Sequence, residues 1–65
     1  MKRIRVLVAD DHTIVRQGLV GILKASDEIE IVGEAADGAE AVDQALKLKP
    51  DVVVLDVSMP HLSGL

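Results

Sequence analysis

The stretch Asp51-Val-Val-Val-Leu-Asp56 places four strand-forming apolar residues, Val52 to Leu55, directly before a carboxylate. A short β-branched run between charged residues predicts a strand that is covered on both faces, as in a parallel sheet. A lone charge buried inside that sheet would be unfavourable. We therefore expect Asp56 to lie at the rim of the sheet, where it faces a ligand.

The chain around this stretch is short, acidic and free of aromatic residues. It has 65 residues, a net charge of -4 and no Cys, Phe, Tyr or Trp. One small domain with a marginal core is expected, without disulfides or a thiolate metal site. The acidic balance argues against a nucleic-acid-binding surface. The apolar run after the basic start is too short for a signal peptide, and no segment has the length of a membrane span. We expect a cytoplasmic protein with no membrane partner.

Two further strands and two helices are predicted before this stretch. Ile4–Ala9 and Ile29–Ala35 are rich in β-branched residues, and the second alternates as an edge strand does. Between them, apolar residues recur at helical spacing, and we expect Arg16 to face away from the core. The predicted core face of this first helix comprises Ile14, Val15, Leu19, Ile22 and Leu23. Gly18 and Gly21 lie beside this face, which predicts close packing on a sheet.

The second helix has clear start and stop signals. Asp37-Gly38 resembles a hairpin turn, but Asp37 with Glu40 fits an N-cap and its partner better, so we favour the helix. Pro50 ends it. Its predicted apolar residues are Ala41, Val42, Ala45, Leu46 and Leu48.

The alternation strand-helix-strand-helix-strand predicts an α/β fold with parallel strands and right-handed crossovers. The simplest spatial order of the strands is 2-1-3, with one helix on each face. A crevice then opens between the carboxyl ends of the first and third strands, where such sheets bind ligands.

Three carboxylates are expected at this crevice. Asp10 and Asp11 follow the first strand, and Asp56 follows the third. Two unit charges about 5 Å apart repel by about 3 kcal/mol at an effective dielectric of 20, so the group favours a cation. Hard oxygen ligands in an open crevice favour Mg²⁺, and a neutralised site leaves Asp56 free to attack phosphorus. Read alone, Asp10 or Asp11 is equally consistent with a helix N-cap.

The chain resembles the receiver domain of two-component response regulators. The resemblance rests on Val6-Leu-Val-Ala-Asp-Asp-His12, on Asp56 after an apolar strand, and on Met59-Pro60-x-x-x-Gly64. Asp10-Asp11-His12 with Arg16-x-Gly18-Leu19 is similar to the NarL/FixJ subfamily, whose members usually carry a C-terminal helix-turn-helix. The fold this implies is flavodoxin-like, as in CheY.

The resemblance also implies roles for individual residues. Asp56 matches the phosphoacceptor, which takes a phosphoryl group from a sensor histidine kinase. Asp10 and Asp11 match the Mg²⁺-binding acidic pair, and Ser58 matches the position whose backbone carbonyl contacts the metal. Pro60 and Gly64 match the loop that shapes the site. We expect His12 to be an exposed residue of the first helical turn, and we assign no role to His61.

A receiver has about five strands and five helices, so residues 1–65 are expected to be its N-terminal part. The Ser/Thr after the fourth strand and the Lys after the fifth, which contact the phosphoryl group, are then lacking, as is any DNA-binding domain. The resemblance implies a regulatory module of transcription, not an enzyme, that reaches DNA only through such a domain.

Two other readings stay open. A Mg²⁺-dependent phosphotransferase of the haloacid dehalogenase type would need D-x-D at the nucleophilic strand, but Ser58 stands in the second position. A structural fragment that self-associates is compatible with the receiver reading. The unpaired edge of the third strand then predicts a homodimer, or else a partly unfolded chain.

Overall fold

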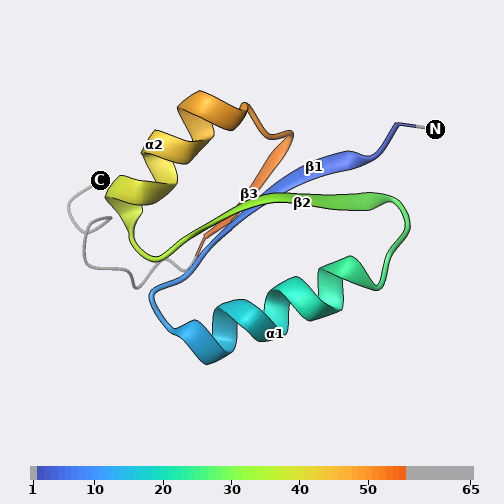
Figure 1. Cartoon of the computed structure of the whole chain (residues 1–65), viewed down its shortest axis with the longest axis horizontal. Helices are drawn as coiled ribbons and strands as arrows, with labels where there is room; N and C mark the ends of the chain where they lie inside the picture. Colours follow the sequence, from blue (N-terminus) through green and yellow to red (C-terminus); the bar gives the residue numbers. More distant parts are fainter. Residues whose placement is uncertain (1, 56–65) are drawn as a thin grey trace.

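A computed structural model of the chain describes residues 2–55. The elements alternate as the sequence predicts, and Figure 1 shows helices on both sides of the strands. They are β1 (Ile4–Ala9), α1 (Thr13–Lys24), β2 (Ile29–Ala35), α2 (Gly38–Leu48) and β3 (Val52–Leu55).

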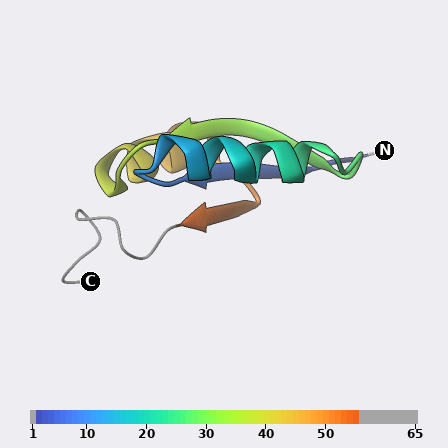
Figure 2. The same cartoon turned by 90° about the horizontal axis from the view of Figure 1, so that it is seen from below.

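The three strands form one parallel sheet in the order β2-β1-β3. All three arrows point the same way in Figure 2. The predicted strand order is therefore confirmed. Because the strands are parallel, the carboxyl ends of all three lie at one edge of the sheet, where the predicted site residues follow them.

The central strand β1 is buried on both faces. Val6 and Val8 pack with Val20 of α1, whereas Ala9 packs with Ala35 and Ala41 on the α2 side. Leu7 and Val8 are the largest fully buried side chains. The alternation of side chains along a strand thus gives each helix its own half of a small core.

The buried face of α1 differs from the predicted one. Val20 is buried, and Leu19 and Leu23 are partly buried beside it. Ile14 and Ile22 are instead 87% and 73% exposed. The helix is rotated so that positions 16, 19, 20 and 23 meet the sheet, the i, i+3, i+4, i+7 spacing of one helical face. The expectation that Arg16 faces away from the sheet is therefore wrong.

The glycines of α1 do not serve close packing. A Cβ added at Gly18 or Gly21 would meet no atom within 4 Å. The expectation of tight packing at both positions is therefore wrong. Their side of the helix faces outward because the buried face is rotated away from them.

The helix α2 begins as predicted. Asp37 is its N-cap and accepts a hydrogen bond from the Glu40 backbone N–H at 2.8 Å. The Glu40 carboxylate reaches back one residue further than expected, to the N–H of Ala36 at 3.3 Å. The helix ends before Pro50, with Lys49 in the left-handed conformation at φ 50°. Ala41 is buried, but Val42 and Leu46 are 57% and 73% exposed.

Close packing at a glycine does occur, in β2. The register of β2 against β1 shifts between Val6 and Leu7, which is a bulge in the pairing. Leu7 is paired with Gly33 just after it. A Cβ on Gly33 would lie 2.5 Å from the Gln44 side-chain oxygen and 2.7 Å from the Leu48 side chain. This position lets α2 approach the sheet closely.

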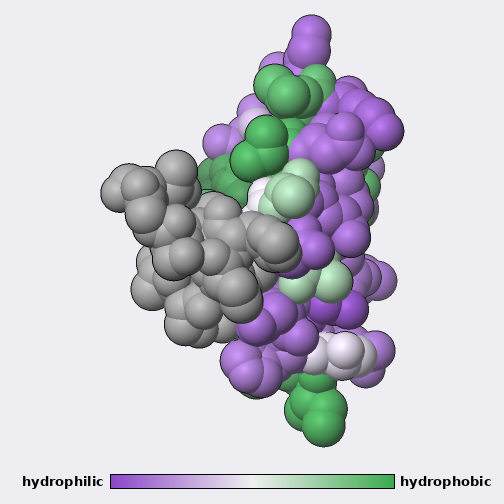
Figure 3. Space-filling view, turned by 90° about the vertical axis from the view of Figure 1, so that its left-hand side faces the viewer, coloured by the Kyte–Doolittle hydropathy of each residue, from purple (hydrophilic) through white to green (hydrophobic). Residues whose placement is uncertain are grey.

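Apolar surface remains uncovered over several elements. Both helices pack mainly on β1 and β2, and Val52 and Leu55 of β3 are 46% and 43% exposed. The prediction that the third strand is covered on both faces is therefore wrong. Figure 3 shows hydrophobic surface in the upper part of the view, on the side of α2, and at the bottom, on the side of α1. Exposed large apolar side chains are Ile4, Ile14, Val15, Ile22, Val42, Leu46, Val52 and Leu55. In the range 2–55, no helix is long and apolar enough to cross a membrane.

Candidate functional site

The carboxyl edge of the sheet brings the ends of β1, β2 and β3 together. Ala9, the last residue of β1, is paired with both Ala35 and Leu55. The backbone N–H of Asp10 still donates to the Ala35 carbonyl at 3.0 Å. Asp10 therefore starts at the level where β1 leaves the sheet, at the predicted rim.

The Asp10 side chain is buried at this rim. Its residue exposure is 3%. The carboxylate accepts the backbone N–H of His12 at 2.8 Å, and the His12 ring nitrogen Nδ1 lies 3.3 Å from the same oxygen. The first of these bonds closes a tight turn between β1 and α1. A buried carboxylate with a backbone donor is held in one orientation.

Asp11 and His12 complete the cluster on the solvent side. The Asp11 carboxylate lies 2.9 Å from His12 Nδ1, and its side chain is 33% exposed. Asp10, Asp11 and His12 each offer one ligand atom, and these atoms lie within 4.8 Å of one another. The structure thus brings together the adjacent acids predicted from the sequence, with Asp10 buried and Asp11 facing solvent.

The N-cap reading of these acids is wrong. His12 occupies the N-cap position of α1, and its side chain makes no capping hydrogen bond. The Asp10 carboxylate bonds the N–H of the N-cap residue itself and none further along the helix. The acids therefore stand before the helix, at the sheet edge.

The donor set fits a hard divalent cation. Two carboxylates from consecutive residues offer oxygen ligands, which Mg²⁺ prefers, and Mg²⁺ keeps several waters when bound. Asp11 is exposed enough to admit those waters, while Asp10 is fixed by the turn. The predicted site also includes oxygen ligands from residues that follow the third strand. Asp56, Ser58, Pro60, His61 and Gly64 lie outside the described residues, so their predicted roles stay predictions.

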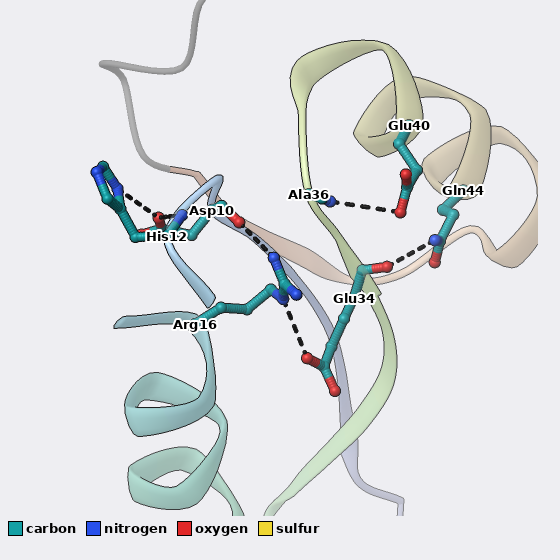
Figure 4. A network of polar contacts seen from close by, with 7 residues as sticks. All are labelled: Asp10, His12, Arg16, Glu34, Ala36, Glu40 and Gln44. Carbon is teal, nitrogen blue, oxygen red and sulfur yellow. Dashed lines mark hydrogen bonds and ion pairs between the residues drawn. The ribbon is translucent and has the colours of Figure 1, made fainter. Parts of the chain in front are cut away.

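A polar network behind the acids was not predicted. The Arg16 guanidinium donates from Nη1 to the Asp10 carbonyl at 2.7 Å and from Nε to the Glu34 carboxylate at 3.3 Å. Figure 4 shows Arg16 reaching toward both residues from α1. The Gln44 side chain of α2 donates to the Glu34 carbonyl at 2.6 Å. The sequence signal for this was present, since Arg16 precedes Leu19, Val20 and Leu23 on one helical face.

Comparison with known proteins identifies the family. The model of the response regulator receiver domain matches residues 6–65. The transcriptional regulatory protein LiaR of Bacillus subtilis is 48% identical over 95% of this chain and 29% of its own length. A protein-glutamate methylesterase/protein-glutamine glutaminase of Pyrococcus abyssi is also 48% identical, over 98% of this chain and 17% of its own. The chain spans less than a third of either relative.

Solved receiver structures share the fold. The signal receiver domain of the response regulator NarL from Mycobacterium tuberculosis superposes with a TM-score of 0.90 at 43% identity, over 92% of this chain and 48% of that one. The response regulator domain of Thermotoga maritima CheB gives 0.89 at 46% identity, over 97% and 47%. The fold is CheY-like, with relatives among NarL/FixJ-type response regulators. This chain belongs to the response regulator receiver domain family.

Proposed function

We propose that the chain is the phosphoacceptor part of a two-component response regulator. Asp56 accepts a phosphoryl group from a sensor histidine kinase, and Asp10, Asp11 and the Ser58 carbonyl hold Mg²⁺ beside it. Residues 1–65 correspond to the N-terminal part of the receiver domain, in line with a match that covers 92% of this chain and 48% of the solved NarL receiver.

The pairing of β1 with β3 is the observation that carries this proposal. Ala9 directly precedes Asp10, Leu55 directly precedes Asp56, and Ala9 and Leu55 are paired neighbours. Parallel strands that end level with each other deliver their next residues to the same rim. This register supports a shared site for Asp10, Asp11 and Asp56.

In phosphoryl transfer the main task of the protein is to position the attacking carboxylate and to stabilise charge. An Asp56 carboxylate oxygen attacks phosphorus as the bond from phosphorus to the kinase imidazole nitrogen breaks. The leaving imidazole nitrogen takes the electron pair of that bond and one proton from solvent, so that it departs as a neutral ring. Bound Mg²⁺ supplies positive charge that offsets the repulsion between carboxylate and phosphoryl oxygens. Asp10 keeps its orientation through the His12 N–H, while Asp11 faces solvent.

The output of the full protein is proposed as control of transcription through a separate DNA-binding domain. One relative is named a transcriptional regulatory protein, and a structure of RcsB bound to a promoter matches this chain at 34% identity with a TM-score of 0.84. The methylesterase relatives carry similar sequences in proteins named for enzymes. We propose that the 65 residues themselves are regulatory and not an enzyme.

Phosphorylation tests this proposal. Incubation with acetyl phosphate and Mg²⁺ is expected to add one phosphoryl group, detected by intact mass and located by peptide mapping at Asp56. The yield is expected to be low if the phosphate-contacting residues of a complete receiver are lacking, so beryllofluoride binding followed by NMR is the parallel readout. Asp56→Asn is expected to abolish both signals.

The matched control is Asp43→Asn. It removes the same charge from an exposed i,i+4 ion pair with Lys47 on α2, away from the β1–α1 turn. It is expected to leave both signals unchanged. Phosphorylation or beryllofluoride binding that survives Asp56→Asn would show that another residue is the acceptor.

A further inference from the structure

The start of α1 has neither of two features that commonly stabilise a helix N-terminus, a side-chain cap and an acidic first turn. The N-cap side chain of His12 makes no capping bond, and no acidic residue stands in the first turn of α1. Arg16 is a cation close to the helix N-terminus, where the helix dipole disfavours positive charge. Its presence there, with a side chain only 16% exposed, calls for a compensating interaction.

Two contacts compensate the charge, and both point at the site. The Nη1 bond to the Asp10 carbonyl is 2.7 Å long, within the range of charge-assisted hydrogen bonds. The Nε contact with the Glu34 carboxylate is 3.3 Å, and Glu34 is 44% exposed. The planar guanidinium thus spans the end of β1 and the end of β2 (Figure 4).

The two polar ends of Asp10 are held from different directions. Its carbonyl is held by Arg16, and its carboxylate is held by the His12 N–H. Rotation of the Asp10 backbone would break the first bond and turn the carboxylate away from Asp11. Glu34 in turn is fixed through its own carbonyl by Gln44 of α2.

We propose that Arg16 is a positioning residue for the cation site: it fixes the backbone of Asp10, and Glu34 fixes Arg16. Arg16 itself donates hydrogen bonds and carries positive charge, so it is no metal ligand. This inference rests on the proposed function, since it assigns a role toward the Mg²⁺ held by Asp10 and Asp11.

The sign of a charge-removing substitution separates positioning from simple electrostatics. A positive charge near a cation site repels the cation, so its removal alone strengthens Mg²⁺ binding. Loss of positioning weakens binding, because residues that orient metal ligands typically contribute about 10- to 100-fold in affinity. We expect Arg16→Gln to weaken Mg²⁺ binding by about 10-fold, at the lower end of that range because the site is partly exposed.

The experiment uses Mg²⁺ titrations followed by the backbone amide NMR signals of Asp11 and His12. Arg16→Lys keeps the charge, but its single nitrogen does not replace both guanidinium contacts, so weaker binding than wild type is expected. Lys47→Gln is the control: it removes the same charge from an exposed ion pair of α2 and should bind Mg²⁺ at least as tightly as wild type. Unchanged amide shifts of Leu7 and Val8 show that the sheet is intact in each variant.

Hydrogen exchange of the His12 amide gives a readout that needs no metal. This N–H donates to the Asp10 carboxylate, so we expect faster exchange in both Arg16 variants and in Glu34→Gln, with no change in Lys47→Gln. Arg16→Lys and Glu34→Gln decide the matter if Arg16→Gln fails to fold.

The outcomes distinguish the two proposals. If wild type binds Mg²⁺ at Asp11 and His12 but the Arg16 variants bind equally or more tightly, or His12 exchange is unchanged, the positioning role is wrong and the proposed function survives. If wild type shows no Mg²⁺-dependent shifts at these amides, the proposed cation site is wrong and the positioning role is overturned with it.

Discussion

Asp10 links the fold to the candidate site through three polar groups. Its backbone N–H continues the pairing of β1 with β2, and its carbonyl accepts from Arg16. Its carboxylate closes the turn onto His12 while lying beside Asp11. A buried carboxylate without such a donor would be strongly unfavourable. The sequence stretch Ala9-Asp10-Asp11-His12 therefore encodes a turn and places two carboxylates side by side, where we propose that they hold a cation.

Gly33 sets how closely α2 approaches the sheet. In Gly33→Ala the new Cβ would lie 2.5 Å from the Gln44 side-chain oxygen, 2.7 Å from Leu48 and 3.2 Å from Leu7. Overpacking of this kind is expected to lower the free energy of unfolding by about 1–3 kcal/mol. Urea denaturation followed by circular dichroism measures it.

Gly18→Ala is the matched control for this substitution. It lies in α1 with no atom within 4 Å of the added Cβ, so it is expected to raise the free energy of unfolding by about 0.5–1 kcal/mol. A Gly33→Ala variant as stable as Gly18→Ala would contradict the close approach of α2.

The elements show which part of the fold the sequence determines. All five were predictable in type and order, because each has a distinct periodicity and clear limits such as Asp37 and Pro50. The order of the strands followed from the edge-like alternation of residues in β2 and from placing one helix on each face. The buried faces of the helices could not be predicted from the sequence. Both α1 and α2 carry more apolar residues than the sheet buries. Ile14 and Leu46 are apolar and yet exposed.

The candidate site was predictable to the same degree. Asp10 and Asp11 follow from strand ends alone, since parallel topology fixes where those ends lie. Arg16 was missed because periodicity assigns a charged residue to the outer face of a helix. Its partners Asp10 and Glu34 are 6 and 18 residues away in sequence, and only the assembled turn brings all three together.

At the scale of the whole molecule, the uncovered apolar surface is the main feature of the 2–55 range. Val52 and Leu55 on β3 are 46% and 43% exposed, and β3 is an edge of the sheet as described. Edge strands with apolar side chains are sites of association. We expect the 65-residue chain to form a homodimer through this edge, or to be partly unfolded.

Sedimentation equilibrium measures this association. Val52→Lys places a charge on β3 and is expected to shift the chain toward monomer. Ile22→Lys, on the outer face of α1, is expected to leave the dimer intact. A wild-type chain that stays monomeric and unfolds in one cooperative thermal transition would contradict the prediction.

The central claim is that one cation site joins the ends of β1 and β3, and paramagnetic mapping with Mn²⁺ tests it most directly. Mn²⁺ shares the oxygen-ligand preference of Mg²⁺, and it broadens nearby amide NMR signals. A six-residue strand spans about 20 Å, so the two ends of the sheet are well separated. We predict broadening at Asp10, Asp11 and Asp56 that excess Mg²⁺ reverses, with Ile4 and Ile29 at the amino ends unaffected. Broadening at Asp10 and Asp11 without Asp56, or equal broadening along the whole sheet, would contradict it.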